Sequence, residues 1–261
     1  MKKLLAPFFS ALRFLTIINV PFWRENWDSN DAAKQFSRSL VYYPLVGLLL
    51  GFALACAYWL LREIVPLPLL GGLLIGFWIW LTGALHLDGL ADCADGVAAS
   101  HKDKTLQDRI MKESTVGTMA VITIAVLLLL KYSALISISS ECIFSALVVI
   151  PVLSRWAVSC MVYIYPYKRA SGAAHTLKEN KSLYVIIIST IVTLVIAIIC
   201  FALSGLLLML AAAATMFLAS MFYKSKLGGL SGDTYGATNE IIEAVLLVIL
   251  AICGFAAIGS V

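Results

Sequence analysis

Seven long apolar runs constrain this chain more than any other feature. A helix needs about 20 consecutive apolar residues to cross the hydrocarbon core of a bilayer, and every run is close to that length. The runs are Val41–Leu61, Leu67–Leu85, Thr118–Ile138, Cys142–Tyr165, Leu183–Leu203, Gly205–Tyr223 and Glu240–Ile258. Only 13% of the 261 residues are charged, against about 25% in a soluble domain. We therefore expect an all-α fold, a polytopic membrane helix bundle of about seven transmembrane helices, with residues 1–261 forming a single integral-membrane domain.

The N-terminal stretch Leu4–Val20 is shorter than the other runs, and Arg13 interrupts it. A helix of this kind lies in the membrane interface more readily than it crosses the bilayer. We interpret it as an interfacial or re-entrant helix, and a full span is the alternative.

The positions of the basic residues predict the orientation. Short loops on the cytoplasmic side of a membrane carry an excess of Lys and Arg. All but three of the 19 Lys and Arg residues lie before the first run or in the three long connections, which are Leu85–Gly117, Pro166–Ser182 and Lys224–Asn239. Of the exceptions, Arg62 lies in a connection on the other side, and Lys131 and Arg155 lie within runs. We expect the N-terminus and the long connections to face the cytoplasm.

Three aspartates follow the second apolar run at helical spacing. Asp88, Asp92 and Asp95 stand at i, i+4 and i+7, so a helix would place them on one stripe. Carboxylates this close repel one another unless a cation neutralises them, and oxygen-rich sites suit Mg²⁺. We expect the cluster to continue directly from the second span, at the membrane surface, and to bind Mg²⁺. A solvated acidic helix face is the alternative, and His86, which points away from the stripe, is a weaker catalytic candidate.

A glycine-rich segment precedes the last apolar run. Its glycines are Gly228, Gly229, Gly232 and Gly236, and the acidic residues that follow at helical spacing are Asp233, Glu240 and Glu243. Glycines leave backbone N–H groups accessible, and a helix that begins near Asp233 would direct its positive end at a phosphate. We predict that Gly228, Gly229 and Gly232 bind a ligand phosphate; a flexible connector with Asp233 as helix N-cap is the alternative. Neither GxGxxG nor GxxxxGK(S/T) occurs, so no Rossmann or P-loop site is indicated.

Three basic residues are candidates for binding phosphate. Arg109 and Lys112 lie shortly after the aspartates, and the alternative for Arg109 is a helix-surface ion pair with Glu113. Arg155 lies inside the fourth run, where an arginine needs a partner. The aspartates or a substrate phosphate are candidate partners, so we expect a functional role or a buried pair; a snorkelling side chain is the alternative. We interpret Lys131 as a structural pair or a snorkelling residue.

The segment His86–Gly96, HLDGLADCADG, resembles the aspartate motif of the cobalamin synthases. Further segments resemble motifs of that family in the same order, so the resemblance covers nearly the whole chain. They are Arg13–Thr16, Tyr43–Gly47, Arg109–Gly117, Ser154–Trp156 and Gly228–Ala237. The stretch Tyr165–Gly172 departs from the family's pattern, which leaves the roles of Lys168 and Arg169 open.

The resemblance implies a catalytic domain in the bacterial inner membrane, with its active site facing the cytoplasm. The family's reaction joins adenosylcobinamide-GDP to α-ribazole or α-ribazole 5′-phosphate and releases GMP, in the last steps of cobalamin biosynthesis. We hypothesise that the aspartates bind Mg²⁺, that one of them also accepts the hydroxyl proton, and that the basic residues stabilise the phosphates. The residues are Asp88, Asp92, Asp95 and Asp233 for the metal, Asp95 for the proton, and Arg109, Lys112 and Arg155 for the phosphates. The expected partners are the two substrates and the lipid bilayer, without nucleic acid, and a homo-oligomer stays open.

Three alternatives remain. CDP-alcohol phosphotransferases also combine a membrane bundle with aspartates, but the arginine of their DGxxAR pattern is missing after Asp88. A secondary transporter would have inverted repeats, and the sequence has no such symmetry. A purely structural membrane subunit would leave both acidic, glycine-spaced segments unexplained.

Overall fold

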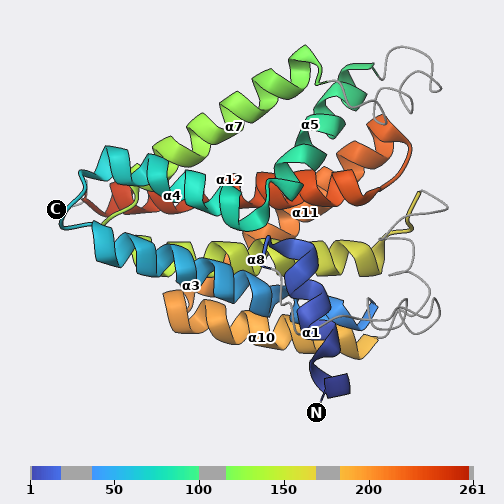
Figure 1. Ribbon diagram of the computed structural model, residues 1–261, viewed down its shortest axis with the longest axis horizontal. Helices are drawn as coiled ribbons and strands as arrows, with labels where there is room; N and C mark the ends of the chain where they lie inside the picture. Colours follow the sequence, from blue (N-terminus) through green and yellow to red (C-terminus); the bar gives the residue numbers. More distant parts are fainter. Residues whose placement is uncertain (1, 19–36, 100–115, 169–182, 259–261) are drawn as a thin grey trace.

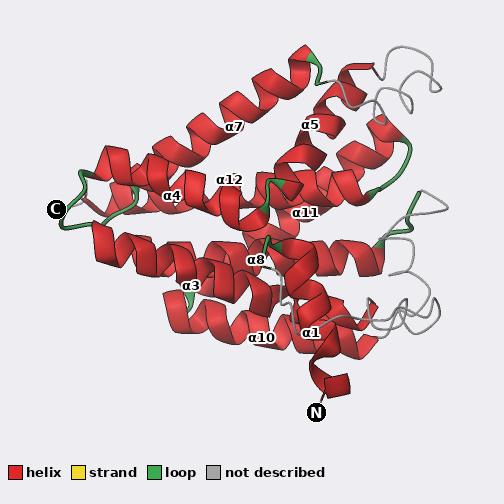
Figure 2. Ribbon diagram, in the orientation of Figure 1, coloured by secondary structure: helices red, strands yellow, loops and turns green. Residues whose placement is uncertain are grey.

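The computed structural model describes residues 2–18, 37–99, 116–168 and 183–258 (Figure 1). Within these ranges every regular element is a helix (Figure 2), which confirms the all-α prediction. The elements are α1 (Lys2–Leu15), the 3₁₀ helix η1 (Leu40–Tyr42), α3 (Tyr43–Leu61), α4 (Leu67–Thr82), α5 (Leu85–Ala98), α7 (Thr118–Ser137), α8 (Ile143–Ile164), α10 (Leu183–Phe201), α11 (Ser204–Leu227) and α12 (Gly232–Ile258).

Among the described helices, six are long and apolar enough to cross a membrane, and the bent pair α4–α5 makes a seventh if it counts as one span. This confirms the prediction of about seven spans. Helix α1 has 14 residues and is about 21 Å long at 1.5 Å per residue, which is less than the ~30 Å of a hydrocarbon core. It is the short N-terminal helix predicted from the apolar pattern.

Helix α8 is the centre of the bundle. Of its apolar window, 89% is buried inside the protein, against 22% for α7 and for α10. It contacts α3, α10, α11 and α12 (Figure 1). Glycines let α3 approach closely, because an added Cβ at Gly51 would lie 2.5 Å from the carbonyl oxygen of Val148. The outer helices instead expose many apolar side chains, as lipid-facing helices do.

The second apolar run is broken, and the prediction that one span continues directly into the aspartate cluster is wrong. Helix α4 ends at Thr82, and α5 begins at Leu85 after a bend of 90°. Gly83 and Ala84 both have positive φ, at 60° and 57°. Glycine adopts this left-handed conformation without strain, whereas alanine there costs about 1 kcal/mol. Hydropathy is continuous across the break, so the apolar pattern does not reveal it.

The C-terminal end of α1 covers this break. The backbone N–H of Ile17 donates to the carbonyl oxygen of Leu81 at 3.0 Å, and the Thr82 hydroxyl donates to the carbonyl oxygens of Trp78 and Ile79. The last carbonyl groups of a helix have no partner within the helix, and inside a membrane they need partners from the protein. These contacts stabilise the corner from which the aspartate-bearing helix α5 starts.

Candidate active site

Helices α5 and α12 touch backbone to backbone. An added Cβ at Gly89 would lie 2.7 Å from the carbonyl oxygen and 3.0 Å from the Cα of Asp233. One turn along, a Cβ at Gly236 would lie 3.1 Å from the Cα of His86. Side chains at these two positions would push the helices apart, so glycine is what permits the contact. The contact brings the aspartate motif of α5 against the start of α12, which begins at Gly232, close to the predicted start near Asp233.

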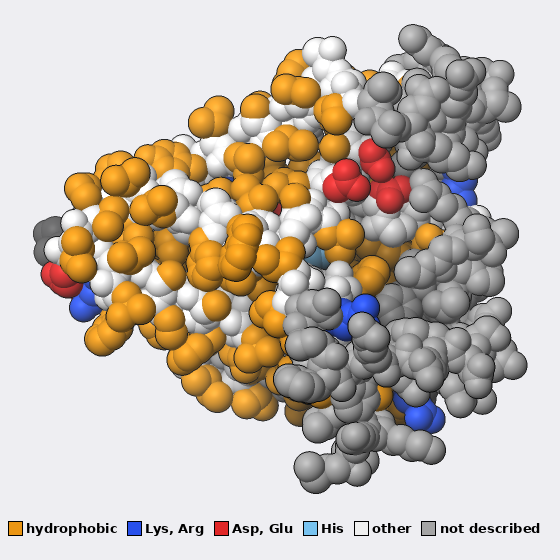
Figure 3. Space-filling model, viewed as in Figure 1, with side chains coloured by type: hydrophobic (Ala, Val, Ile, Leu, Met, Phe, Trp, Pro, Cys, Tyr) orange, Lys and Arg blue, Asp and Glu red, His pale blue; other side chains and the backbone are white. Residues whose placement is uncertain are grey.

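Acidic side chains gather where these two helices meet. Asp88 is exposed, and Asp92, Asp95 and Asp233 are half-buried. Figure 3 shows acidic side chains together on the visible face, near α5 in the orientation of Figure 1. In the described residues, no three His, Cys, Asp or Glu side chains are grouped closely enough to ligate one ion. Binding of Mg²⁺ by the four aspartates therefore stays a prediction.

The Asp95 carboxylate caps the N-terminus of α7. The backbone N–H of Gly117 donates to its Oδ2 at 2.7 Å, and that of Ala120 donates to its Oδ1 at 2.9 Å. These N–H groups belong to the start of α7, where the first N–H groups have no partner within the helix and the dipole favours an anion. Each Asp95 oxygen keeps a second lone pair. Asp95 therefore ties the end of α5 to the start of α7, a role that sequence reasoning missed.

Two cations and two anions form a buried network deeper in the bundle, and they come from three helices. Lys131 of α7 lies 2.5 Å from Glu240 Oε2 and 2.6 Å from Glu243 Oε2, both on α12. The Arg155 guanidinium of α8 lies 2.8 Å from Glu243 Oε1 and is fully buried. The predicted structural pair at Lys131 is confirmed. For Arg155, the partner among the described residues is Glu243, which confirms the expected buried pair with a partner other than the aspartates.

The network also reaches α5 through neutral groups. Asn239 donates to Glu243 Oε1 at 2.9 Å, and its Nδ2 lies 3.3 Å from Nδ1 of His86. His86 is buried and faces α12, so it lies away from the exposed aspartate stripe, as its position in the helix predicts. Asn239 thus connects the charged groups of α12 to the first turn of the aspartate-bearing helix.

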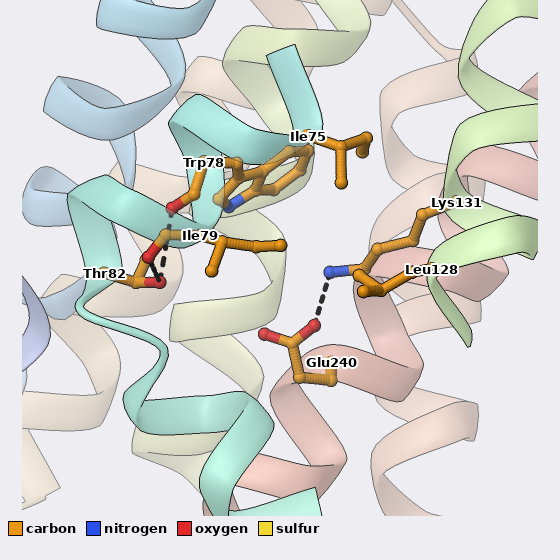
Figure 4. A pocket seen from close by; sticks show the side chains of 7 residues that line it. All are labelled: Ile75, Trp78, Ile79, Thr82, Leu128, Lys131 and Glu240. Carbon is orange, nitrogen blue, oxygen red and sulfur yellow. Dashed lines mark hydrogen bonds and ion pairs between the residues drawn. The ribbon is translucent and has the colours of Figure 1, made fainter. Parts of the chain in front are cut away.

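A small cavity adjoins the network between α4, α7 and α12. Figure 4 shows Lys131 and Glu240 pointing toward each other at its edge, with Trp78 above them. The Lys131 Nζ lies 5.0 Å from the Trp78 ring centroid, within the range of a cation–π contact. The cavity holds about 10 Å³, which is room for about one water molecule. It is too small for a substrate.

A model of one protein family, described as Cobalamin-5-phosphate synthase, matches residues 7–251 of the chain. The chain belongs to this family. Among its relatives is the adenosylcobinamide-GDP ribazoletransferase of Pseudomonas putida, 37% identical over 246 residues that cover 94% of this chain and 98% of the relative. Proteins of the same name from Acinetobacter baumannii and Desulforamulus reducens are 34% and 35% identical, and they cover 93% and 92% of the chain. No solved structure matches the chain.

The glycine-rich segment forms the turn between α11 and α12. Gly228 ends α11 with φ of 72°, a left-handed conformation typical of glycine after a helix. An added Cβ at Gly228 or at Gly232 would meet nothing within 4 Å. The side chain of Lys168 lies against Gly229, and its Nζ donates to the Leu227 carbonyl oxygen at 2.8 Å. Phosphate binding by the three glycines stays a prediction.

Two of the predicted phosphate-binding residues, Arg109 and Lys112, lie outside the described residues, and their roles stay predictions. The structure adds Asn239, Glu240 and Glu243 as partners that the sequence did not identify. The available signal was charge balance, because two cations within apolar runs require two buried anions. Glu240 and Glu243 lie three residues apart at the start of the last run, and they fit that requirement.

Proposed function

We propose that this chain is an adenosylcobinamide-GDP ribazoletransferase. A hydroxyl oxygen of α-ribazole, or of its 5′-phosphate, forms a bond to the phosphorus that carries cobinamide. The bond from that phosphorus to the GMP oxygen breaks, GMP leaves, and the hydroxyl loses its proton. Support comes from the family match over residues 7–251 and from relatives of that name that cover more than nine-tenths of the chain.

The backbone contact between Gly89 and Asp233 carries the proposal for where the reaction takes place. It brings the aspartates of α5 beside Asp233 at the start of α12, so carboxylates from two segments distant in the sequence lie near one another. Asp88, Asp92 and Asp233 would hold Mg²⁺, and Asp95 could add the lone pairs that its backbone partners leave unused. No three of these side chains are grouped around one point in the described residues, so an ion held here would keep waters and take substrate phosphates as further ligands, as Mg²⁺ does. When bound, Mg²⁺ neutralises charge on the diphosphate.

The protein's own groups would then orient the two substrates. A helix N-terminus favours a phosphate, although Ser231 already accepts from the N–H groups of Thr234 and Tyr235 in the first turn of α12. Arg109 and Lys112 are proposed to bind phosphate oxygens, and Asp95 to accept the hydroxyl proton. Arg155 is fully buried and its Nη1 is paired with Glu243, so a contact between its remaining N–H groups and a substrate would require the residues that cover it to move. The distribution of Lys and Arg supports a site that faces the cytoplasm from the bacterial inner membrane.

The test is direct. Purified protein in liposomes receives adenosylcobinamide-GDP and α-ribazole 5′-phosphate, with Mg²⁺ or with a chelator, and GMP is measured. We expect GMP with Mg²⁺ and a strong loss of the product with the chelator. A CDP-alcohol offered in place of adenosylcobinamide-GDP should give no CMP. Monodisperse protein that releases no GMP at any Mg²⁺ concentration would contradict the proposal.

A further inference from the structure

The buried network lies directly beneath the proposed site, on the same helix. Glu240 and Glu243 follow Asp233 by seven and ten residues along α12, which is about 10 and 15 Å of helix. His86, which Asn239 contacts, comes two residues before Asp88 on α5. The network therefore contacts both helices that carry the proposed metal ligands.

The charges of the network balance. Lys131, Arg155, Glu240 and Glu243 carry two positive and two negative formal charges, and all four are buried. Removing one of them would leave an uncompensated charge inside the bundle, which is costly, whereas apolar residues in place of a whole pair are often neutral for stability. Stability alone therefore does not require this network.

The hydrogen bonding of the network is also incomplete. Nε and Nη2 of Arg155 and Oδ1 of Asn239 have no hydrogen-bond partner among the described residues. Buried polar groups without partners are unusual in folded proteins and call for an explanation. A requirement for fixed geometry between helices is such an explanation, since intramembrane charges mark functional regions by default.

The partners of α12 lie on three neighbouring helices. Lys131 holds it to α7, Arg155 holds it to α8, and Asn239 holds it to His86 of α5. Three connections around one helix fix both its rotation about its axis and its depth. Rotation and depth of α12 decide where the Asp233 carboxylate lies relative to Asp88 and Asp92.

We propose that Lys131, Arg155, Asn239, Glu240 and Glu243 are positioning residues that fix α12 so that Asp233 completes the metal site on α5. This inference rests on the proposed function. A displacement near 1 Å at a catalytic group can lower a rate by about 100-fold. Loss of the network should therefore lower turnover and metal affinity even where the protein remains folded.

The test is the double variant Lys131→Met/Glu240→Gln, which removes the α7–α12 pair and keeps the buried charge balanced. Its control, Arg62→Met/Glu63→Gln, removes an exposed ion pair with a 3.1 Å Nε–Oε1 distance. Like the double variant, the control loses one positive and one negative charge. Each protein is purified in detergent, and three quantities are measured: the melting temperature, Mn²⁺ affinity by electron paramagnetic resonance, and kcat for GMP release. We expect the double variant to melt close to the wild type, with Mn²⁺ affinity at least about 5-fold weaker and kcat about 10- to 100-fold lower. The control should match the wild type in all three.

Asn239→Leu provides a second variant that leaves every charge in place and removes the connection to α5. It tests the positioning role if the double variant does not fold. We expect Asn239→Leu likewise to weaken Mn²⁺ affinity and to lower kcat. Wild-type Mn²⁺ affinity and kcat in a folded network variant would overturn the positioning role alone. Wild-type protein that binds no Mn²⁺ would refute the proposed metal site, and the positioning role with it.

Discussion

Replacing Gly89 by alanine tests whether the close approach of α5 and α12 creates the active site. The new Cβ would lie 2.7 Å from the carbonyl oxygen and 3.0 Å from the Cα of Asp233. Both are backbone atoms, so no side chain can rotate to relieve the overlap. The helices would have to separate by roughly 0.5–1 Å to reach the 3.5 Å at which carbon atoms ordinarily touch. Overpacking of this kind costs about 1–3 kcal/mol, and such a displacement of Asp233 should lower kcat by about 10- to 100-fold.

The assay measures GMP release at saturating substrates, together with thermal unfolding in detergent, for Gly89→Ala and for Gly76→Ala. Gly76 is a matched control, because it lies inside α4 and an added Cβ there would meet nothing within 4 Å. An alanine in a helix interior is more favourable than glycine by about 0.5–1 kcal/mol, so Gly76→Ala should keep full turnover and unfold no earlier than the wild type. Full turnover in Gly89→Ala, with an unchanged melting temperature, would refute the role of the α5–α12 contact.

Three further predictions concern stability and use thermal unfolding in detergent as the measurement. Asp95→Ala removes the cap of α7 and should cost about 0.5–2 kcal/mol, whereas Asp95→Asn keeps one acceptor oxygen and should cost less; equal stability of Asp95→Ala and the wild type would contradict the capping role. Gly51→Ala places a Cβ 2.5 Å from the Val148 carbonyl oxygen and should cost about 1–3 kcal/mol, while Gly72→Ala, with open space around it, should not destabilise; the reverse order would be inconsistent with the α3–α8 packing. Arg155→Met leaves Glu243 with one cation instead of two and should destabilise by about 3–5 kcal/mol, seen as a lower melting temperature; a variant as stable as the wild type would rule out a charged Arg155–Glu243 pair.

The sequence predicts the fold well because membrane spans depend on a local property. Runs such as Thr118–Ile138 and Leu183–Leu203 match α7 and α10 to within a few residues, since hydropathy and length decide whether a helix can span a bilayer. The corner at Gly83 and Ala84 was not predicted, because it is held by a contact with the segment just after α1, where the Ile17 N–H donates to the Leu81 carbonyl oxygen, and not by apolar pattern. A single glycine followed by alanine gives no local sign of a 90° bend.

The candidate site, like the fold, could be predicted from the sequence only in part. Helical spacing places the aspartates on one stripe of α5, and the start of α12 near Asp233 follows from the glycines before it. The pairing of Arg155 with Glu243 spans 88 residues, and the sequence supplies the charges without saying which of them meet. The cap that Asp95 provides for α7 could not be predicted from the sequence either. It depends on how the start of α7 lies against the end of α5.

The most direct measurement compares how GMP release by Asp92→Asn and Asp233→Asn depends on Mg²⁺ concentration. If carboxylates from α5 and α12 share one ion, both variants should need at least about 10-fold more Mg²⁺ than the wild type for half-maximal turnover, since each loses one anionic ligand. A variant at either position that keeps the wild-type Mg²⁺ requirement and full turnover would show that the two segments do not bind a common cation.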